Sequence, residues 1–178
     1  THGSVNDNIA DAWVYLNGNL QGIYELPATF PVLANGRNTV EVFGGIKVTG
    51  RSLFRERYPF YLSDQKVIDF KPNKDAFFNP VVQYADESRF VLLDDFEKVN
   101  PQLYLFEGPA DVSISDLDGV EGNYMLVELQ KDASRALLLS QDSFPVPSRS
   151  QDFYMEVDYK CDTTVAFYLT SKNTTMDL

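Results

Sequence analysis

The sequence predicts an all-β protein of two sandwich-type modules. Apolar and polar residues alternate with period two along much of the 178-residue chain, and helical periodicity is absent. Aromatic residues make up 13% of the chain, mostly Phe and Tyr, which favour strands. Short strand-like runs recur about every ten residues with turn residues between them, as in sandwiches. A 44% share of hydrophobic residues allows a packed core without metals or disulfides.

A hairpin signal predicts the first two strands. Residues 12–16 alternate and lead into Asn17-Gly18, a dipeptide preferred in type I′ turns because both of its residues tolerate positive φ. Residues 19–26 are therefore expected to form the return strand. Two prolines then exclude an interior strand, which predicts a loop over residues 27–36.

Alternation and chain breakers predict the rest of the first half. Residues 38–43 alternate cleanly, and Gly44-Gly45 is expected to end that strand. Further strands are expected at residues 57–62, 66–70 and 80–84, with residues 63–65 joining the first two of these as a hairpin.

A polar, aperiodic run at residues 85–89 predicts a domain boundary. We expect a polar N-terminal tether at residues 1–9, a first module at 10–85 and a second at 90–178. The strands expected in the second module are residues 90–96, 111–115, 124–130, 135–140, 152–159 and 164–170.

Charge and cysteine content exclude several classes of partner and site. The formal net charge is −11 and the pI about 4.4, a surface that repels nucleic acid and anionic lipid headgroups. The single cysteine, Cys161, permits neither an internal disulfide nor a Cys/His zinc site. No apolar run approaches the roughly 18 residues that a membrane span needs. The polar start at Thr1 is typical of a tether that follows a removed signal peptide or a lipid anchor.

The first half resembles a family of surface domains. Residues 12–27, AWVYLNGNLQGIYELP, combine a strand, a turn glycine, a second glycine and a Pro-containing loop, and residues 35–42, NGRNTVEV, add a valine-rich strand. This pattern is similar to PEGA-type domains. Together with residues 45–47 and 58–61, it resembles the N-terminal module of envelope lipoproteins of Gram-negative bacteria. The resemblance covers residues 10–84 and implies a small immunoglobulin-like sandwich in an exported protein of the bacterial outer membrane or cell surface.

The second half resembles another kind of module. Residues 90–97, FVLLDDFE, and residues 153–159, FYMEVDY, are similar to strands of carbohydrate-binding jelly rolls. The implied role is glycan binding or adhesion. A jelly roll uses eight strands, and about six are expected after residue 90. We therefore expect a jelly-roll-like module that is incomplete in this chain, with a smaller six-stranded sandwich as the alternative.

Aromatic side chains are the candidate glycan contacts, because sugars stack their apolar faces on rings. In the pattern that the first half resembles, the alternate residues of strand 12–16 point inward, which places Trp13 and Tyr15 outside the core. The alternative is that both rings pack on the strands near residues 58–61 or on the second module. The candidates in the second module are Tyr104 and Phe106, in an expected loop, and Tyr124.

Three carboxylates are candidate ligands for a structural calcium ion. Asp94, Asp95 and Glu97 resemble the strand-edge calcium position of some jelly-roll binding modules, and calcium prefers oxygen ligands. The alternative is that these three carboxylates bind no calcium. No other cofactor is expected.

We expect no catalytic activity. The only histidine, His2, lies in the expected tether, where a general base is poorly held. Cys161 is interpreted as a small half-buried hydrophobe. The paired carboxylates at 95/97 and 156/158 share strand faces and would suit an atypical glycosidase only if they converged in a cleft. The predicted function is thus binding of a glycan or another envelope component, with a structural or assembly subunit as the alternative.

Overall fold

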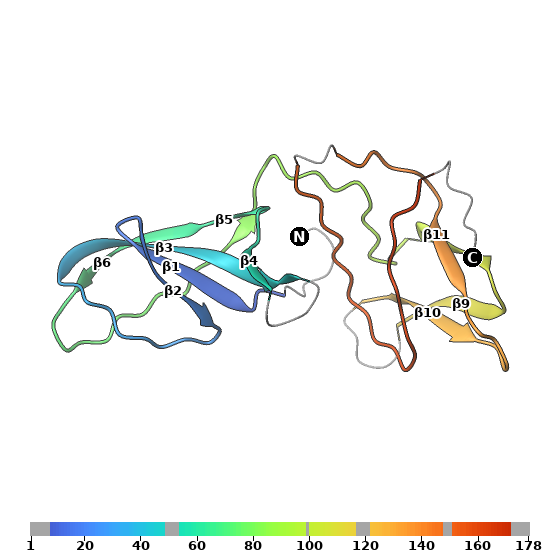
Figure 1. Ribbon diagram of the computed structural model, residues 1–178, viewed down its shortest axis with the longest axis horizontal. Coiled ribbons are helices and arrows are strands. Elements are labelled where there is room, and N and C mark those ends of the chain that lie inside the picture. The colour runs from blue at the N-terminus through green and yellow to red at the C-terminus, as the bar shows by residue number, and fades with distance from the viewer. Residues whose placement is uncertain (1–7, 49–53, 99, 117–121, 148–150, 172–178) are drawn as a thin grey trace. The chain divides into compact units, whose positions relative to one another are not determined.

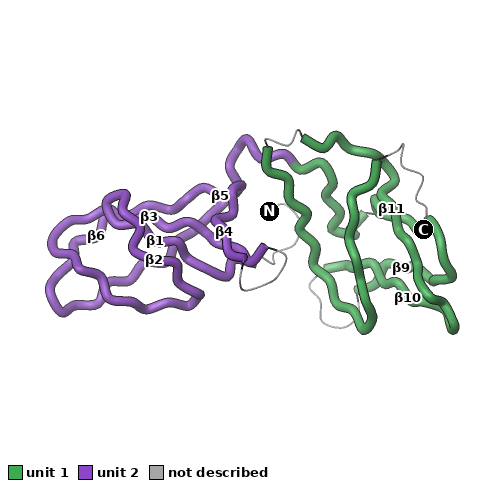
Figure 2. Tube along the Cα trace, in the orientation of Figure 1, with its two compact units in different colours: residues 1–6, 90–178 green, residues 7–89 purple. Residues whose placement is uncertain are grey.

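The computed structural model describes residues 8–48, 54–98, 100–116, 122–147 and 151–171 (Figure 1). Its sheets are antiparallel throughout, which confirms the predicted all-β fold class. Residues 8–89 form one compact unit and residues 90–171 the other (Figure 2). Most of the expected tether, residues 1–7, lies outside the described residues.

The first unit is built on a five-stranded sheet. Its strands run in the order β2 (Asn19–Glu25), β1 (Asp11–Leu16), β3 (Gly36–Lys47) and β4 (Arg55–Arg57), and β6 (Asp64–Phe70) pairs with β3. The long strand β3 is central, because β1 pairs with one of its edges and β6 and β4 divide the other.

The expected hairpin joins β1 to β2. Asn17 and Gly18 have φ values of 48° and 79°, as a type I′ turn requires. The amide of Asn17 reaches across to β3, where its Nδ2 donates to Asn38 Oδ1 at 2.8 Å and its Oδ1 accepts from the Thr39 amide at 2.9 Å. The turn residue therefore also fixes the neighbouring strand.

One face of the sheet carries the core of this unit. Alternate residues of β1 and β3 are buried there, namely Ala12, Val14, Leu16, Val40 and Val42. The loop between β2 and β3 and the segment after β6 cover this inner face with partly buried rings, including Phe30 and Phe78. Tyr24 stacks on Phe30 with ring centroids 3.7 Å apart.

The prediction that Gly44-Gly45 ends a strand is wrong, because β3 continues through both glycines to Lys47. The glycines instead allow close approach of other groups. A Cβ at Gly44 would lie 3.1 Å from Ile9 Cδ1, and a Cβ at Gly45 would lie 2.8 Å from Trp13 Nε1.

Three further predictions for this unit need correction. Residues 57–62 do not form one strand, because a turn at Pro59 separates β4 from the short β5 (Tyr61–Leu62). Residues 63–65 form no hairpin, since β5 pairs with β7 (Gln83–Tyr84) and β6 pairs with β3. The strand expected at 80–84 is reduced to the two residues of β7.

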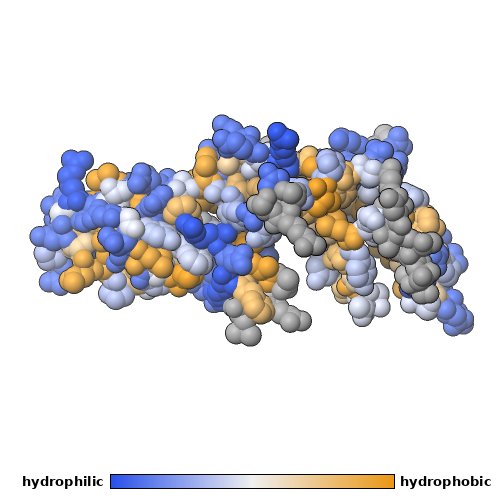
Figure 3. Space-filling model, turned by 45° about the horizontal axis from the view of Figure 1, so that its top comes forward, coloured by the Kyte–Doolittle hydropathy of each residue, from blue (hydrophilic) through white to orange (hydrophobic). Residues whose placement is uncertain are grey.

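The second unit contains two small antiparallel ladders within its described residues. β9 (Ala110–Ser115) pairs with β10 (Tyr124–Leu129), and β8 (Leu103–Glu107) pairs with β11 (Leu137–Ser140). Ala110 is the only buried hydrophobic residue among the described part of this unit. Hydrophobic residues are visible at the surface of both units (Figure 3).

The strand expected at residues 90–96 is absent. Asp94 Oδ1 accepts the Phe96 amide at 3.1 Å, Asp95 Oδ1 accepts the Glu97 amide at 3.2 Å, and Phe96 has a φ of 58°. These side-chain bonds to nearby amides compete with a strand ladder and turn the chain instead.

Residues 152–159 and 164–170 were also expected to be strands, and neither is one. They form two extended segments on either side of residues 160–163 (Figure 1). The rings of Tyr159 and Phe167 meet edge to face, with their centroids 5.6 Å apart. A strand needs a hydrogen-bonded neighbour, which the described part of the chain does not supply here.

Candidate functional site

The face of the five-stranded sheet opposite the core, called the outer face below, carries the two N-terminal aromatic candidates. Trp13 and Tyr15 are partly exposed on β1, between the buried Ala12, Val14 and Leu16. Trp13 lies directly opposite Phe43 of β3, and Tyr15 meets the Phe43 ring edge to face at 5.5 Å. The structure therefore adds a third ring, Phe43, to the two predicted ones.

The outer face also exposes aliphatic side chains around these rings. Leu20 and Ile23 of β2 lie opposite Tyr15 and Trp13 and are 48% and 42% exposed. Together with the three rings, they form the outer-face patch. Large exposed apolar patches on soluble proteins commonly mark binding surfaces.

Polar groups lie among these rings. Arg57 of β4 holds its guanidinium carbon 4.7 Å from the centre of the Phe43 ring. Glu41, opposite Tyr15, accepts a hydrogen bond from Ser63 Oγ at 2.7 Å, and Gln65 lies opposite Glu41 and is exposed. Carboxylate, amide and guanidinium groups beside rings are the combination that sugar hydroxyls require.

A charged cluster closes one end of the outer face. Arg55 of β4 pairs with the fully buried Asp11 of β1, and its other nitrogen lies 3.3 Å from Glu25 of β2. Lys47 of β3 pairs with the same Glu25 at 3.2 Å. Hydrogen bonds from Lys47 and Arg55 lower the pKa of Glu25 below its usual value of 4.5. Asp11 lies opposite Gly45 of β3 and Arg55 lies opposite Lys47 of β3, so this pair links the two strands that flank β3.

The ring contacts do not support the alternative in which Trp13 and Tyr15 pack on residues 58–61. Tyr58 is buried, and its ring meets those of Phe60, Tyr61 and Tyr84 edge to face at 4.7–6.3 Å. Tyr15 packs instead on Phe43.

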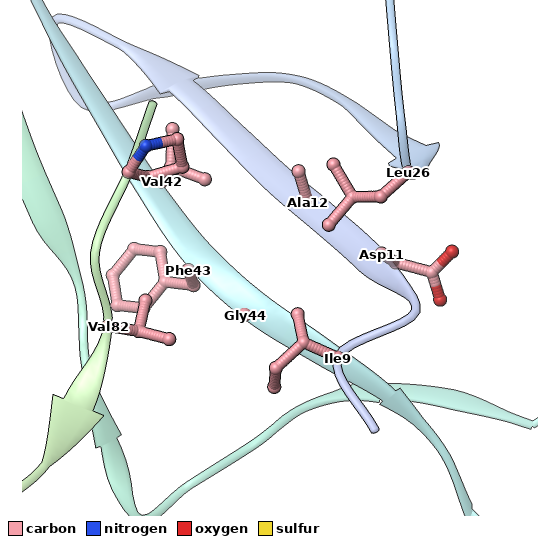
Figure 4. Close-up of a pocket in the computed structure, with 9 residues that line it drawn as sticks. Ile9, Asp11, Ala12, Leu26, Val42, Phe43, Gly44 and Val82 are labelled. Carbon is pink, nitrogen blue, oxygen red and sulfur yellow. The ribbon is translucent and has the colours of Figure 1, made fainter. Parts of the chain in front are cut away.

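A small apolar cavity of about 70 Å³ lies against the inner face (Figure 4). It is bounded by β1 and β3 and by the side chains of Ile9, Leu26, Pro80 and Val82. Small-molecule sites usually have volumes of about 300–1,000 Å³, so this cavity is a packing gap. This cavity is therefore not a candidate ligand site.

The aromatic candidates of the second unit lie on two different ladders. Tyr104 and Phe106 are on β8, not in a loop as expected, and are 41% and 56% exposed. Their segment is a strand because its alternating apolar residues pair with the leucines of β11. Tyr124 is partly buried at the start of β10, opposite Ser115. Tyr104 and Phe106 therefore lie on the same strand, whereas Tyr124 lies on the other ladder.

The three candidate calcium ligands are engaged with the protein's own amides. Asp94 accepts the Phe96 and Gln102 amides. Glu97 holds Asn123, whose backbone amide and Nδ2 donate to its two oxygens at 2.8 and 3.0 Å. No group of three potential metal-ligating side chains occurs within the described ranges. A calcium site here stays a prediction.

In the carboxylate pair at residues 156 and 158, the pKa of one member is shifted. Partial burial, with a smaller contribution from the charge of Asp158, raises the pKa of Glu156 above 4.5.

Sequence reasoning missed Phe43 and Arg57. Phe43 was placed at the last position of a strand that actually continues, and Arg57 at the start of a strand that actually ends there. Knowledge of the strand register would have identified both. Phe43 lies opposite Trp13, and Arg57 lies opposite Gly45, two residues further along β3.

No helix among the described residues is long and apolar enough to cross a membrane. Comparisons of the chain with protein-family models, with curated proteins and with solved structures found no match.

Proposed function

We propose that this chain is a non-catalytic, exported protein of a bacterial surface that binds glycans through the outer-face patch. The observation that carries the proposal is the set of three neighbouring rings, Trp13, Tyr15 and Phe43, with Arg57 on Phe43 and exposed aliphatic side chains around them.

The spacing of these groups suits a sugar chain. Ile23, Trp13 and Phe43 lie in one row across β2, β1 and β3. Neighbouring strands are about 4.8 Å apart, so the row spans about 10 Å, comparable to a disaccharide. Rings would stack on the apolar faces of the sugars, while Glu41, Gln65 and Arg57 supply hydrogen-bonding groups.

Export and surface location are supported by the resemblance of residues 10–84 to PEGA-type modules of envelope lipoproteins. A binding role, in preference to catalysis, is supported by the scarcity of nucleophile–base combinations in a chain with one histidine and one cysteine.

A glycan array probed with the intact chain tests the proposal. We expect binding that Trp13→Ala and Tyr15→Ala reduce at least tenfold, because each removes a stacking ring. Tyr104→Ala is the matched control, since Tyr104 is an exposed ring on a strand of the other unit. Glycan binding lost equally in the Tyr104 variant would move the site to the second unit, and an array with no binding would reject the function.

A second candidate function, an assembly subunit, is supported by exposed apolar residues in the second unit. Met155, Val157, Phe167 and Leu169 lie at alternate positions of the two extended segments and are 43–52% exposed. Apolar residues in this arrangement favour contact with another polypeptide chain.

Sedimentation velocity over a range of protein concentrations tests this second candidate. An assembly subunit should self-associate, and Phe167→Ser should weaken the association by removing an exposed ring. A chain that stays monomeric at every concentration would count against it.

A further inference from the structure

We propose that the outer-face patch selects sugars that carry a carboxylate, and that Arg57 is the residue that recognises it. This inference rests on the proposed glycan-binding function of the same face. The juxtaposition behind it is a guanidinium held on a ring of the stacking platform.

The two arginines of β4 have different surroundings. Arg55 and Arg57 are two residues apart on one strand, so both side chains belong to the outer face. Arg55 is neutralised by Asp11 and Glu25. Among the described residues, no carboxylate lies within ion-pair distance of Arg57, although the chain has 26 acidic and 15 basic residues. Arg55 therefore serves the fold, and the charge of Arg57 is available to a ligand.

The ring beneath Arg57 orients it. The guanidinium carbon lies 4.7 Å from the centre of Phe43, a distance at which a cation is attracted to the ring face. This contact restricts the side chain, and no hydrogen bond to another described residue occupies its N–H groups. These N–H groups form a planar fork that matches the two oxygens of a carboxylate.

The guanidinium of Arg57 lies beside the rings on which a sugar would stack. Phe43 meets Tyr15 edge to face and lies opposite Trp13, so a pyranose stacked on Trp13 and Tyr15 would have Arg57, which lies on the Phe43 ring, at its side. A uronic acid carries its carboxylate at the edge of the ring, outside the stacked face. One sugar can thus use the platform and the fork together.

The net charge limits the class of ligand further. A protein with a charge of −11 repels dense polyanions at long range. Physiological salt screens exposed charges beyond about 8 Å, so one carboxylate beside Arg57 is attracted by the local cation. The expected ligand is a glycan with isolated uronic acid residues.

The test uses two disaccharides of the same linkage, one with a glucuronic acid residue and one with glucose in its place. Isothermal titration calorimetry and the emission of Trp13, the only tryptophan, report binding to the intact chain. We expect the acidic disaccharide to bind about tenfold or more tightly, as a charge-assisted hydrogen bond predicts.

Two variants assign the preference to Arg57. Arg57→Gln should reduce binding of the acidic disaccharide about tenfold and leave that of the neutral one nearly unchanged, and Arg57→Lys should restore only part of the loss. Lys66→Gln is the matched control, because Lys66 places its Nζ 5.9 Å from the centre of the Phe78 ring, on the inner side of the same sheet.

The outcomes separate the inference from the proposed function. Equal binding of both disaccharides, unchanged in Arg57→Gln, would overturn acidic selection and leave glycan binding standing. An equal loss in Lys66→Gln would attribute the preference to net charge and overturn the role of Arg57. Failure of both disaccharides and of the whole glycan array would reject the function together with the inference.

Discussion

Gly45 of β3 lies against the indole of Trp13 on the outer face. A Cβ at this position would lie 2.8 and 2.9 Å from Nε1 and Cδ1 of Trp13 and 3.1 Å from Asp11 Cβ. Gly45→Ala should therefore displace the indole and destabilise the first unit by about 1–3 kcal/mol, the usual effect of overpacking. Urea unfolding followed by Trp13 emission measures both changes.

Gly44→Ala is the control for this prediction. Its Cβ would meet the side chain of Ile9 on the inner face, most closely Cδ1 at 3.1 Å, and this flexible side chain can move aside. We expect a smaller loss of stability and no change in the emission wavelength. Native stability and unchanged Trp13 emission in Gly45→Ala would contradict the close approach.

Glu25 makes the stability of the first unit depend on pH. Hydrogen bonds from Lys47 and Arg55 lower its pKa in the folded state, so the ionised carboxylate favours folding. This contribution is fully present above pH 4.5, the usual value, and is lost as the pH falls through the lowered pKa. Glu25→Gln should therefore be less stable than the wild type at neutral pH and equally stable in acid. Denaturation curves over this pH range, repeated at high salt to screen the pairs, would detect it; a difference that persists in acid would refute it.

At the scale of elements, Arg55 connects the edge strand β4 to β1 across the central strand. Its partner Asp11 is 0% exposed, and the Arg55 side chain is 26% exposed. Arg55→Gln would leave a buried carboxylate without its cation, which should destabilise the first unit by about 3 kcal/mol. Lys47→Gln should change stability much less, because its partner Glu25 is 61% exposed and solvent screens the pair. Equal effects of the two variants on the unfolding midpoint would contradict a structural role for the Asp11–Arg55 pair.

Strands were predictable where local pattern and pairing agree. The hairpin of β1 and β2 follows from Asn17-Gly18, whose positive φ values the sequence signals directly. The path of β3 through Gly44-Gly45 was not predictable, because the reason for glycine there is the indole of Trp13 on a neighbouring strand. Residues 152–159 have the alternation of a strand but lack a paired neighbour, and alternation cannot supply one.

The candidate site was likewise predictable only where the local pattern decides the position of a side chain. The outward position of Trp13 and Tyr15 follows from the period of two along β1. The positions of Phe43 and Arg57 depend on register between strands whose paired residues, such as Asp11 and Gly45, are up to 34 residues apart in sequence, and a single sequence does not reveal it.

At the scale of the whole molecule, the two units differ in their cores. The first buries Leu16 and four other side chains in one cluster, whereas Ala110 is the one buried hydrophobic residue in the described part of the second. The first unit should therefore unfold at higher denaturant concentration, and amide hydrogens in β1 and β3 should exchange more slowly than those in β9 and β10.

Leu16→Ala tests whether the cores are separate. The substitution removes a side chain that is 9% exposed and leaves a cavity, which should lower the stability of the first unit by about 2–4 kcal/mol. Hydrogen exchange read by mass spectrometry should show faster exchange in residues 11–16 and 36–47 and unchanged exchange in residues 110–115 and 124–129. Leu129→Ala is the control, because Leu129 is already 39% exposed on β10 and should leave the first unit unaffected. Loss of protection in both units on Leu16→Ala would mean that they unfold as one cooperative body, and glycan binding at the outer face would then depend on the second unit as well.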